Sequence, residues 1–429
     1  MSAVGEWGII FGCSMRYLLT PVGSSGDVHP FVGIGRELKA RGHEVFLFAA
    51  EPHRQVAEGN GLAFVATASI EEYHTATRNP DLWHPRKGVE TVLRMIIPSL
   101  ESSRKALEER YQPGNTFIVG HPLAFAARTF EEQVGAPAAT IHLAPSSLRS
   151  AYKVPALPGG TDISSLPLWL KRALWVLIDK GGLDPIIVPT LNQWRATLGL
   201  PPVYRVFRDW LNSRQMVIGL FPEWFGPRQP DWPLHFQQAS FPLWDDPHGS
   251  PLDAELSAFI ASGTPPIVVS PGSANRHAAQ FFAAAAEAIQ RLGRRGIFLT
   301  GFPEQLPPAL PDTIVHRSYA PFSTVLPSCA MLVHHGGIGT LAQGLSAGVP
   351  QLIMPMAFDQ PDNALRATAL GVARWLDPRQ FTADNVTHAL EELLGSASVA
   401  AAVIEIEGRL RDVDGIAMAC DLIERGAKK

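Results

Sequence analysis

Short apolar segments alternate with helix-like segments twice along this chain, and a stretch rich in Pro and Trp separates the two series. In the first series, residues 16–20, 44–49 and 117–120 have the character of buried strands. The second series includes residues 266–270 and 331–335. Such alternation is typical of parallel sheets that are covered by helices on both faces. The sequence therefore predicts an α/β protein with two doubly wound, Rossmann-like domains facing a central cleft.

The domain boundaries follow from the same pattern. Met15 directly precedes the first strand, so residues 1–14 are expected to be an extension that does not belong to the fold. The first domain is predicted over residues 15–220 and the second over residues 254–400. Residues 221–253 are dense in Pro and Trp, which is typical of an interdomain linker. Residues 401–429 are expected to form an amphipathic C-terminal helix.

Composition excludes several classes of protein. The chain has 429 residues, with 36 Lys and Arg against 40 Asp and Glu, which argues against binding nucleic acid through positive charge. Cys13, Cys329 and Cys420 are scattered, with neither a disulfide framework nor zinc spacing, which favours a reducing, cytoplasmic compartment. No apolar run reaches the roughly 18 residues of a membrane span, and no signal peptide is expected.

The strongest motif is the segment from Met331 to Thr340, in which an apolar strand runs into a Gly-rich turn that opens a helix. Gly337 and Gly339 would let a ligand approach the backbone, while the start of the helix offers free N–H groups. His335 and Thr340 would donate further hydrogen bonds, so an anion site is predicted. The alternatives are a turn that binds nothing and a dinucleotide pattern completed by Asp359.

Other candidate residues also follow predicted strands. Asp359 and Gln360 come after the strand at 351–355 and would hold sugar hydroxyls, with an N-cap as the alternative for Asp359. Ser273 ends a small loop after residues 266–270 and would donate to a phosphate. Asp27 ends the Gly/Ser loop after the first strand, where a general base would lie, again with an N-cap as the alternative. An Asp pKa near 3.9 would have to be raised by burial for that role.

Two further segments have less specific patterns. Residues 145–215 are rich in Leu, Pro and Trp and are predicted to form helices over an apolar cleft, although an ordinary helical core is equally consistent. The Asp-Val-Asp at 412–414 matches a metal-binding pattern, but it lies in the predicted C-terminal helix and is interpreted as a solvated face. No metal site and no cofactor are predicted.

The succession Tyr319-Ala-Pro-Phe322, His335-Gly-Gly-Ile-Gly-Thr340 and Asp359-Gln360 resembles the donor-binding signature of family-1 glycosyltransferases of the GT-B fold. The resemblance implies a catalytic base at Asp27 and a donor site on the second domain. It also implies a role for each remaining residue: Tyr319 stacks on the nucleotide base, Gln343 lies at the ribose, His335, Gly337, Gly339, Thr340 and Ser273 contact the diphosphate, and Asp359 and Gln360 contact the sugar.

Within that family, stretches such as Leu220-Phe-Pro-Glu-Trp-Phe225 are most similar to the bacterial rhamnosyltransferases of mono-rhamnolipid synthesis. The resemblance implies inverting, metal-independent transfer of rhamnose or glucose from a dTDP- or UDP-sugar to the hydroxyl of an apolar acceptor, such as a hydroxyalkanoyl lipid. A lipid acceptor would allow peripheral membrane contact. Two alternatives stay open: a nucleotide-sugar epimerase of the same fold, and a non-catalytic protein that binds sugar nucleotide or lipid.

Overall fold

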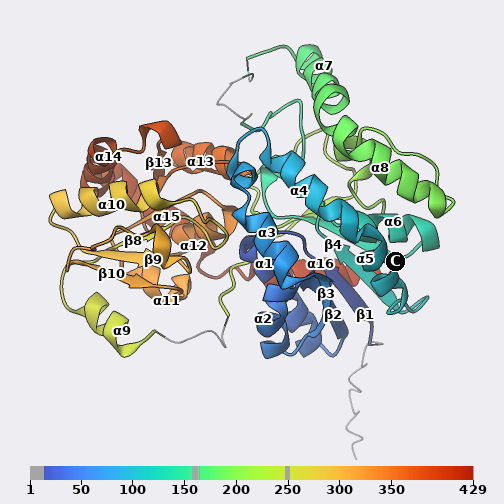
Figure 1. The fold of residues 1–429 in the computed structure, drawn as a ribbon, viewed down its shortest axis with the longest axis horizontal. Helices are drawn as coiled ribbons and strands as arrows, with labels where there is room; N and C mark the ends of the chain where they lie inside the picture. Colours follow the sequence, from blue (N-terminus) through green and yellow to red (C-terminus); the bar gives the residue numbers. More distant parts are fainter. Residues whose placement is uncertain (1–13, 157–162, 164, 247–251, 429) are drawn as a thin grey trace, which may run out of the picture.

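A computed structural model of the chain describes residues 14–156, 163, 165–246 and 252–428. It contains two parallel β-sheets with helices packed around each, and the two units lie next to one another (Figure 1). The predicted fold class, two doubly wound α/β units, is confirmed. The extension expected at 1–14 falls outside the described residues except for Ser14.

The first sheet has the strand order β3-β2-β1-β4-β5-β6-β7, and every pair is parallel. The interior strand β1 pairs with β2 and β4 and carries Leu18 and Leu19, which are fully buried. Strands buried on both faces are apolar throughout, which is why these segments are recognisable in the sequence. The strands are β1 (Arg16–Thr20), β2 (Glu44–Ala50), β3 (Ala63–Ala68), β4 (Thr116–Gly120), β5 (Ala138–His142), β6 (Met216–Gly219) and β7 (Phe236–Gln238).

The second sheet has the order β10-β9-β8-β11-β12-β13 and is also parallel. Its central strand β11 pairs with β8 and β12, and all four of its side chains are buried. The strands are β8 (Ile267–Ser270), β9 (Gly296–Leu299), β10 (Ile314–Arg317), β11 (Met331–His334), β12 (Gln351–Ile353) and β13 (Ala373–Trp375).

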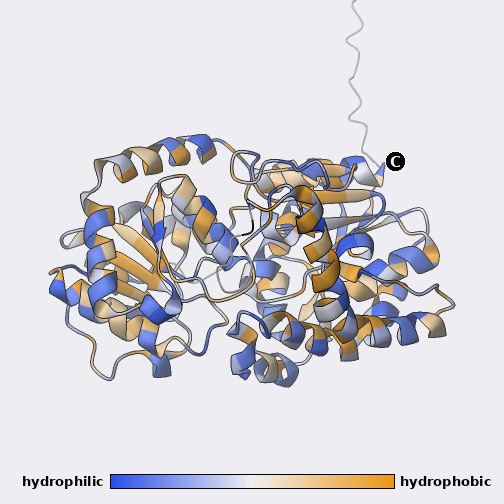
Figure 2. Cartoon of the chain, turned by 90° about the horizontal axis from the view of Figure 1, so that it is seen from above, coloured by the Kyte–Doolittle hydropathy of each residue, from blue (hydrophilic) through white to orange (hydrophobic). Residues whose placement is uncertain are grey.

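Helices cover both faces of each sheet, and Figure 2 shows apolar colours on many strands and mixed colours on the helices around them. In the first unit they are α1 (Ser25–Ala40), α2 (Arg54–Gly59), α3 (Ile70–Arg78), α4 (Gly88–Ile96), α5 (Leu100–Glu108), α6 (Phe125–Val134), α7 (Leu168–Ile178) and α8 (Asp184–Thr197). Those that follow are α9 (Ala254–Ala261), α10 (Ala279–Arg291), α11 (Phe322–Val325), α12 (Ile338–Ser346), α13 (Gln360–Ala369), α14 (Ala383–Gly395), α15 (Ala397–Leu410) and α16 (Gly415–Ala427).

The predicted linker is shorter in the structure than residues 221–253. Within this range, β7 adds to the edge of the first sheet beside β6. Phe236 of β7 is buried and stacks on Phe221, so the aromatic residues that looked like linker composition form part of a core. The chain leaves the first sheet only after β7, and residues 247–251 lie outside the described part.

The C-terminal tail is two helices, whereas the sequence predicts one. The first, α15, packs on the second unit, and the chain then turns at residues 411–414 before α16 returns to the first sheet. Cys420 and Ile423 of α16 are fully buried in the core around α1, beside which α16 lies in Figure 1. Asp414 accepts a hydrogen bond from the Ala417 backbone N at 2.9 Å. The Asp-Val-Asp segment is therefore an exposed turn that ends at the N-cap of α16, so it is solvated as predicted but does not lie within a helix.

Each sheet has one point at which the strand order reverses direction. These points lie between β1 and β4 in the first sheet and between β8 and β11 in the second. Open parallel sheets bind ligands at the carboxyl ends of the strands that flank such a point. The loops that follow these four strands are therefore the places to look for a site.

Candidate active site

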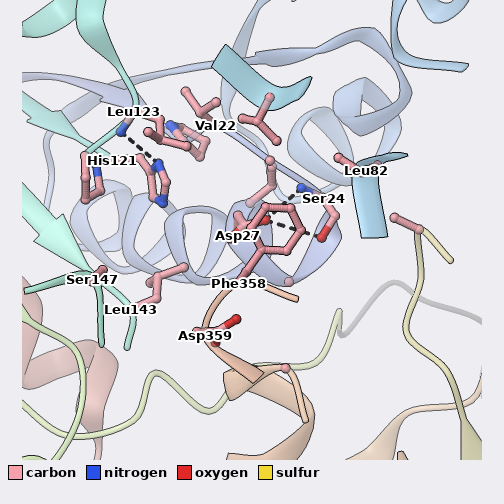
Figure 3. A pocket seen from close by; sticks show the side chains of 18 of the residues that line it. Val22, Ser24, Asp27, Leu82, His121, Leu123, Leu143, Ser147, Phe358 and Asp359 are labelled. Atoms are coloured by element: carbon pink, nitrogen blue, oxygen red, sulfur yellow. Dashed lines mark hydrogen bonds between the residues drawn. The ribbon is translucent and has the colours of Figure 1, made fainter. Parts of the chain in front are cut away.

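A cavity of about 2070 Å³ lies between the two units. The loops after β1 and β4 line it from one side, and the loops after β8, β11 and β12 line it from the other. Figure 3 shows Asp27 and Asp359 approaching it from different elements. Every residue predicted for the site lines this cleft: Asp27, Ser273, Tyr319, His335, Gly337, Gly339, Thr340, Gln343, Asp359 and Gln360.

Asp27 lies in the first turn of α1, because the helix begins at Ser25, within the loop that was predicted to end at Asp27. Its Oδ2 accepts hydrogen bonds from the Ser24 backbone N at 2.8 Å and from the Ser24 hydroxyl at 3.3 Å. Gly23 makes this arrangement possible, since a side chain there would overlap the Asp27 carboxylate. Asp27 is therefore not the N-cap residue, and its second oxygen keeps the capacity to accept a proton.

The protonation of Asp27 is set by its surroundings. Burial raises the pKa of Asp27 to about 7, the hydrogen bond from the Ser24 backbone opposes the rise, and the charge of Asp359 adds to it. Burial likewise raises the pKa of Asp359 to about 6, against a hydrogen bond from Asn363. A general base works best when its pKa lies near the working pH. The structure thus supplies the pKa shift that a basic role for Asp27 requires.

His335 follows β11 and is enclosed by two glycine turns. A Cβ on Gly337 would lie 2.5 Å from His335 Nε2, and one on Gly272 would lie 2.7 Å from His335 Cε1. Both glycines are therefore needed for the ring to occupy this position. Burial lowers the pKa of His335 to about 4, so the imidazole is neutral near pH 7. It can act at this site as a neutral hydrogen-bond donor.

The helix α12 starts directly beyond this turn, with Gly337 at its N-cap position and no side chain capping it. The first N–H groups of a helix have no intrahelical acceptor and lie at the positive end of its dipole. Gly339 is exposed, and a Cβ there would meet open space. Exposed backbone donors beside a neutral imidazole donor suit an anion such as a diphosphate.

Asp359 ends the tight loop between β12 and α13, and Gln360 is the first residue of α13. Phe358 has a φ of 59°, in the left-handed region that a bulky residue rarely adopts. Gln360 stabilises the loop, because its Oε1 accepts hydrogen bonds from the backbone N atoms of Met356 at 2.8 Å and Ala357 at 3.1 Å. The side-chain oxygen of Gln360 is thus used within the loop, and the N–H groups of its side-chain amide could donate to a ligand.

Asn363 connects this loop to the glycine turn. Its Nδ2 donates to Asp359 Oδ2 at 2.7 Å and to the Gly336 carbonyl at 2.9 Å. Asp359 occupies the N-cap position of α13, but its side chain makes no capping bond there. The N-cap alternative for Asp359 is therefore not supported, and its carboxylate is directed to the interior of the site.

Tyr319 and Gln343 lie further along the same side of the cleft, next to a residue that the sequence analysis missed. The Asp245 carboxylate accepts a hydrogen bond from the Ser323 backbone N at 2.8 Å and another from Gln343 Nε2 at 3.5 Å. Burial, and then the charges of Asp245 and Asp246, raise the pKa of Tyr319 to about 12. Asp245 was overlooked because it lies in the predicted linker, although two adjacent carboxylates after a Trp were a visible signal.

The opposite side of the cleft is mainly apolar. The predicted contribution of residues 145–215 is confirmed for α7 and α8, whereas the role of α4 was not predicted. His121 was also missed, although it directly follows the strand β4. Its ring Nδ1 accepts a hydrogen bond from the Leu123 backbone N at 3.2 Å (Figure 3). The apolar lining comes from Val89, Val92, Leu93, Met95 and Ile96 of α4, Leu174, Trp175 and Ile178 of α7, Ile186 of α8, and the loop residues Leu123 and Leu143.

Metal sites and membrane-spanning helices are both absent from the part of the chain that the structure describes. No group of three or more His, Cys, Asp or Glu side chains there is arranged to hold a metal ion. Within the same residues, no helix combines the length and the hydrophobicity needed to cross a membrane.

Comparison with known proteins identifies relatives of the whole chain. Residues 302–411 match the C-terminal domain of the family described as erythromycin biosynthesis protein CIII-like. The O-mycaminosyltylonolide 6-deoxyallosyltransferase of Streptomyces fradiae is 29% identical over 425 residues, which cover 96% of this chain and 98% of that protein. Similarity to relatives of this kind therefore extends well beyond the matched domain.

Solved structures of low sequence identity share the fold. The glycosyltransferase of kitacinnamycin has a TM-score of 0.74 at 22% identity, covering 97% of this chain and all of that one. The spinosyn rhamnosyltransferase in complex with thymidine diphosphate has a TM-score of 0.67 at 18% identity, covering 96% of this chain and all of that one.

Two parallel-sheet units that face one cleft are the architecture of the GT-B glycosyltransferase structures that the chain resembles. Over nearly its whole length the chain is similar to named glycosyltransferases, and residues 302–411 match a domain found in such enzymes.

Proposed function

We propose that this enzyme transfers rhamnose or glucose from a dTDP- or UDP-sugar to the hydroxyl of an apolar acceptor, with inversion and without a metal ion or other cofactor. One observation carries the proposal. Asp27, on the first unit, lines the same cleft as His335, Gly337 and Asp359 on the second. A base and a diphosphate site on opposite walls would hold an acceptor and a donor face to face.

In the proposed reaction, Asp27 takes the proton of the acceptor hydroxyl while the hydroxyl oxygen attacks the anomeric carbon of the sugar. The bond from that carbon to the diphosphate breaks, and the nucleoside diphosphate leaves from the opposite side, which inverts the anomeric centre. His335, Ser273 and the start of α12 would stabilise the charge that builds on the diphosphate. Asp359 and the amide of Gln360 would hold the sugar hydroxyls.

The domain roles in this proposal follow from the linings of the cleft. Residues 15–220 would bind the acceptor and residues 254–400 the donor. The apolar walls from α4 and α7 suit an acceptor with a large hydrophobic surface. They also favour transfer over the epimerase alternative, which needs no second substrate.

Relatives support this choice of substrates by their names. One relative is named for transfer of 6-deoxyallose to O-mycaminosyltylonolide, and one similar structure is a spinosyn rhamnosyltransferase complexed with thymidine diphosphate. A natural-product aglycone of this kind and a hydroxyalkanoyl lipid are both apolar and bear hydroxyl groups. A lipid acceptor would bring peripheral membrane contact, and a cytoplasmic location completes the proposal.

A panel of donors and acceptors tests the proposed function. The enzyme would be incubated with UDP-glucose or dTDP-rhamnose, with a macrolide aglycone or a 3-hydroxydecanoyl ester, and with and without EDTA. We expect release of nucleoside diphosphate that depends on an acceptor, persists in EDTA, and yields a glycoside of inverted configuration by NMR. Loss of activity in EDTA would refute metal independence, and a rearranged sugar nucleotide formed without acceptor would identify an epimerase.

A further inference from the structure

The segment 242–246 passes between the two units, and its side chains contact both of them. The Trp244 ring lies edge-on to His29 at a centroid distance of 5.2 Å, and a Cβ on Gly33 of α1 would lie 3.0 Å from it. The next residue, Asp245, is bonded to the second unit through Ser323 and Gln343. One short segment thus places a carboxylate in the wall of the donor side of the cleft.

The position of Asp245 along α12 is the second observation. Gly339, Thr340 and Gln343 are spaced so that they share one helix face, and all three line the cleft. Gln343 lies about one turn, roughly 5 Å, beyond the helix start. If the diphosphate is bound at that start, the pentose attached to it reaches the level of Gln343 and Asp245.

The chemistry of this position is specific. An ionised carboxylate only accepts hydrogen bonds, and its two oxygens offer about four acceptor positions. Two of the bonds to Asp245 come from Ser323 and Gln343, which leaves capacity for further donors. Pentose hydroxyls are such donors, and the half-exposed Tyr319 ring, close enough for Asp245 to raise its pKa, could stack on an attached base.

We propose that Asp245 accepts hydrogen bonds from the pentose hydroxyls of the donor nucleotide, and that Gln343 orients its carboxylate. This inference rests on the proposed function, because it assumes that a nucleoside diphosphate binds at the start of α12. Asp245 is then a specificity-determining residue that the interdomain segment contributes to the donor site.

The test compares nucleotides that differ only in the pentose. Dissociation constants would be measured by calorimetry for UDP against 2′,3′-dideoxy-UDP, and for dTDP against its 3′-deoxy analogue. A hydrogen bond to a charged group typically changes affinity by about tenfold or more. The wild type is expected to bind UDP, dTDP or both. For each nucleotide that it binds, the affinity should be about tenfold higher than for the analogue that lacks the pentose hydroxyls.

The variant Asp245→Ala should remove this preference: affinity for UDP or dTDP falls about tenfold, and affinity for the deoxy analogue stays unchanged. Asp245→Asn keeps an acceptor for the Ser323 N–H and should retain part of the preference. Asp384→Asn, an exposed carboxylate at the start of α14, is the control for a general loss of negative charge.

Two results would overturn the inference while leaving the proposed function intact. Equal loss of affinity for both members of a pair in Asp245→Ala would assign a structural role to this residue. An unchanged preference would show that the carboxylate does not contact the pentose. Failure of wild-type enzyme to bind either UDP or dTDP would instead overturn the proposed function and this inference with it.

Discussion

Asp27 and Asp359 line one cleft from different units, and the negative charge of Asp359 raises the pKa of Asp27. Asp359, which is proposed to hold the donor sugar, therefore also influences the pKa of Asp27, the proposed base. Both groups lie in the cleft and are partly shielded from bulk water, which raises both pKa values and strengthens their mutual repulsion. The relationship links the two halves of the site through charge as well as through the substrates between them.

The first prediction concerns this coupling. Asp359→Asn removes the charge that disfavours ionisation of Asp27, so the pKa of Asp27 should fall below its wild-type value of about 7. Carbon-13 NMR of labelled aspartate carboxyl groups measures the shift without any need for turnover. Asp384→Asn should leave the titration of Asp27 in place. A pKa that is identical in Asp359→Asn and the wild type would show that the two charges do not interact.

The second prediction concerns stability. The Asp27 pKa is about 7 in the folded protein against an ordinary value of 3.8, so between these values the folded state binds more protons than the unfolded state. Its contribution to stability is then greatest at low pH and falls as the pH rises from about 4 to about 7. The variant Asp27→Asn does not lose stability in this way. The difference between its Tm and the wild-type Tm should therefore increase from about pH 4 to about pH 7 and stay constant at higher pH. A constant Tm difference across these pH values would contradict the raised pKa.

The third prediction separates two glycines of the diphosphate turn. Gly337→Ala should lower both Tm and nucleotide affinity, because its Cβ would lie 2.5 Å from His335 Nε2. Gly339→Ala is the matched control, since its Cβ would meet open space and alanine suits a helix at least as well as glycine, so Tm should not fall. If the diphosphate contacts the backbone at Gly339 as proposed, nucleotide affinity should still fall in this variant. Undiminished affinity in Gly339→Ala would move the diphosphate away from α12.

The fourth prediction concerns His335. Because its pKa is lowered to about 4, this residue would stabilise the diphosphate by hydrogen bonding and not by charge. His335→Ala should weaken UDP or dTDP binding by about tenfold or more, whereas His388→Ala, an exposed histidine on α14, should have no effect. Calorimetry measures both. Unaltered affinity in His335→Ala would place the phosphate site elsewhere.

The elements that the sequence predicted well are those whose signal is local. Buried parallel strands such as β1 and β11 are apolar throughout, and the glycine turn after β11 is marked by its own residues. The ten proposed site residues were found from such signals, together with a family resemblance, and all of them line one cleft. Their individual roles stay predictions, because position in a cleft does not by itself establish contact with a substrate.

The features that were missed depend on contacts between distant parts of the chain. Asp245 joins the site only because its segment lies against α11 and α12, about 80 to 100 residues later in the sequence. The return of α16 to α1 depends on a core shared by the two ends of the chain. The strand β7 was overlooked because it is short and its aromatic residues resembled a linker. The pKa of Asp27 likewise depends on burial, which one sequence does not show.

The central claim is that Asp27 is the base of a sugar transfer, and one variant tests it most directly. Initial rates of acceptor-dependent nucleoside diphosphate release would be measured from pH 5 to pH 9 for the wild type and Asp27→Asn, with nucleotide affinity measured alongside. The wild-type rate should fall as the pH drops below about 7, since protonated Asp27 cannot take a proton. Asp27→Asn should be slower by about 10²–10⁴-fold, with a flat profile and unchanged nucleotide affinity. A variant that transfers at the wild-type rate, with the same pH dependence, would remove Asp27 from the mechanism.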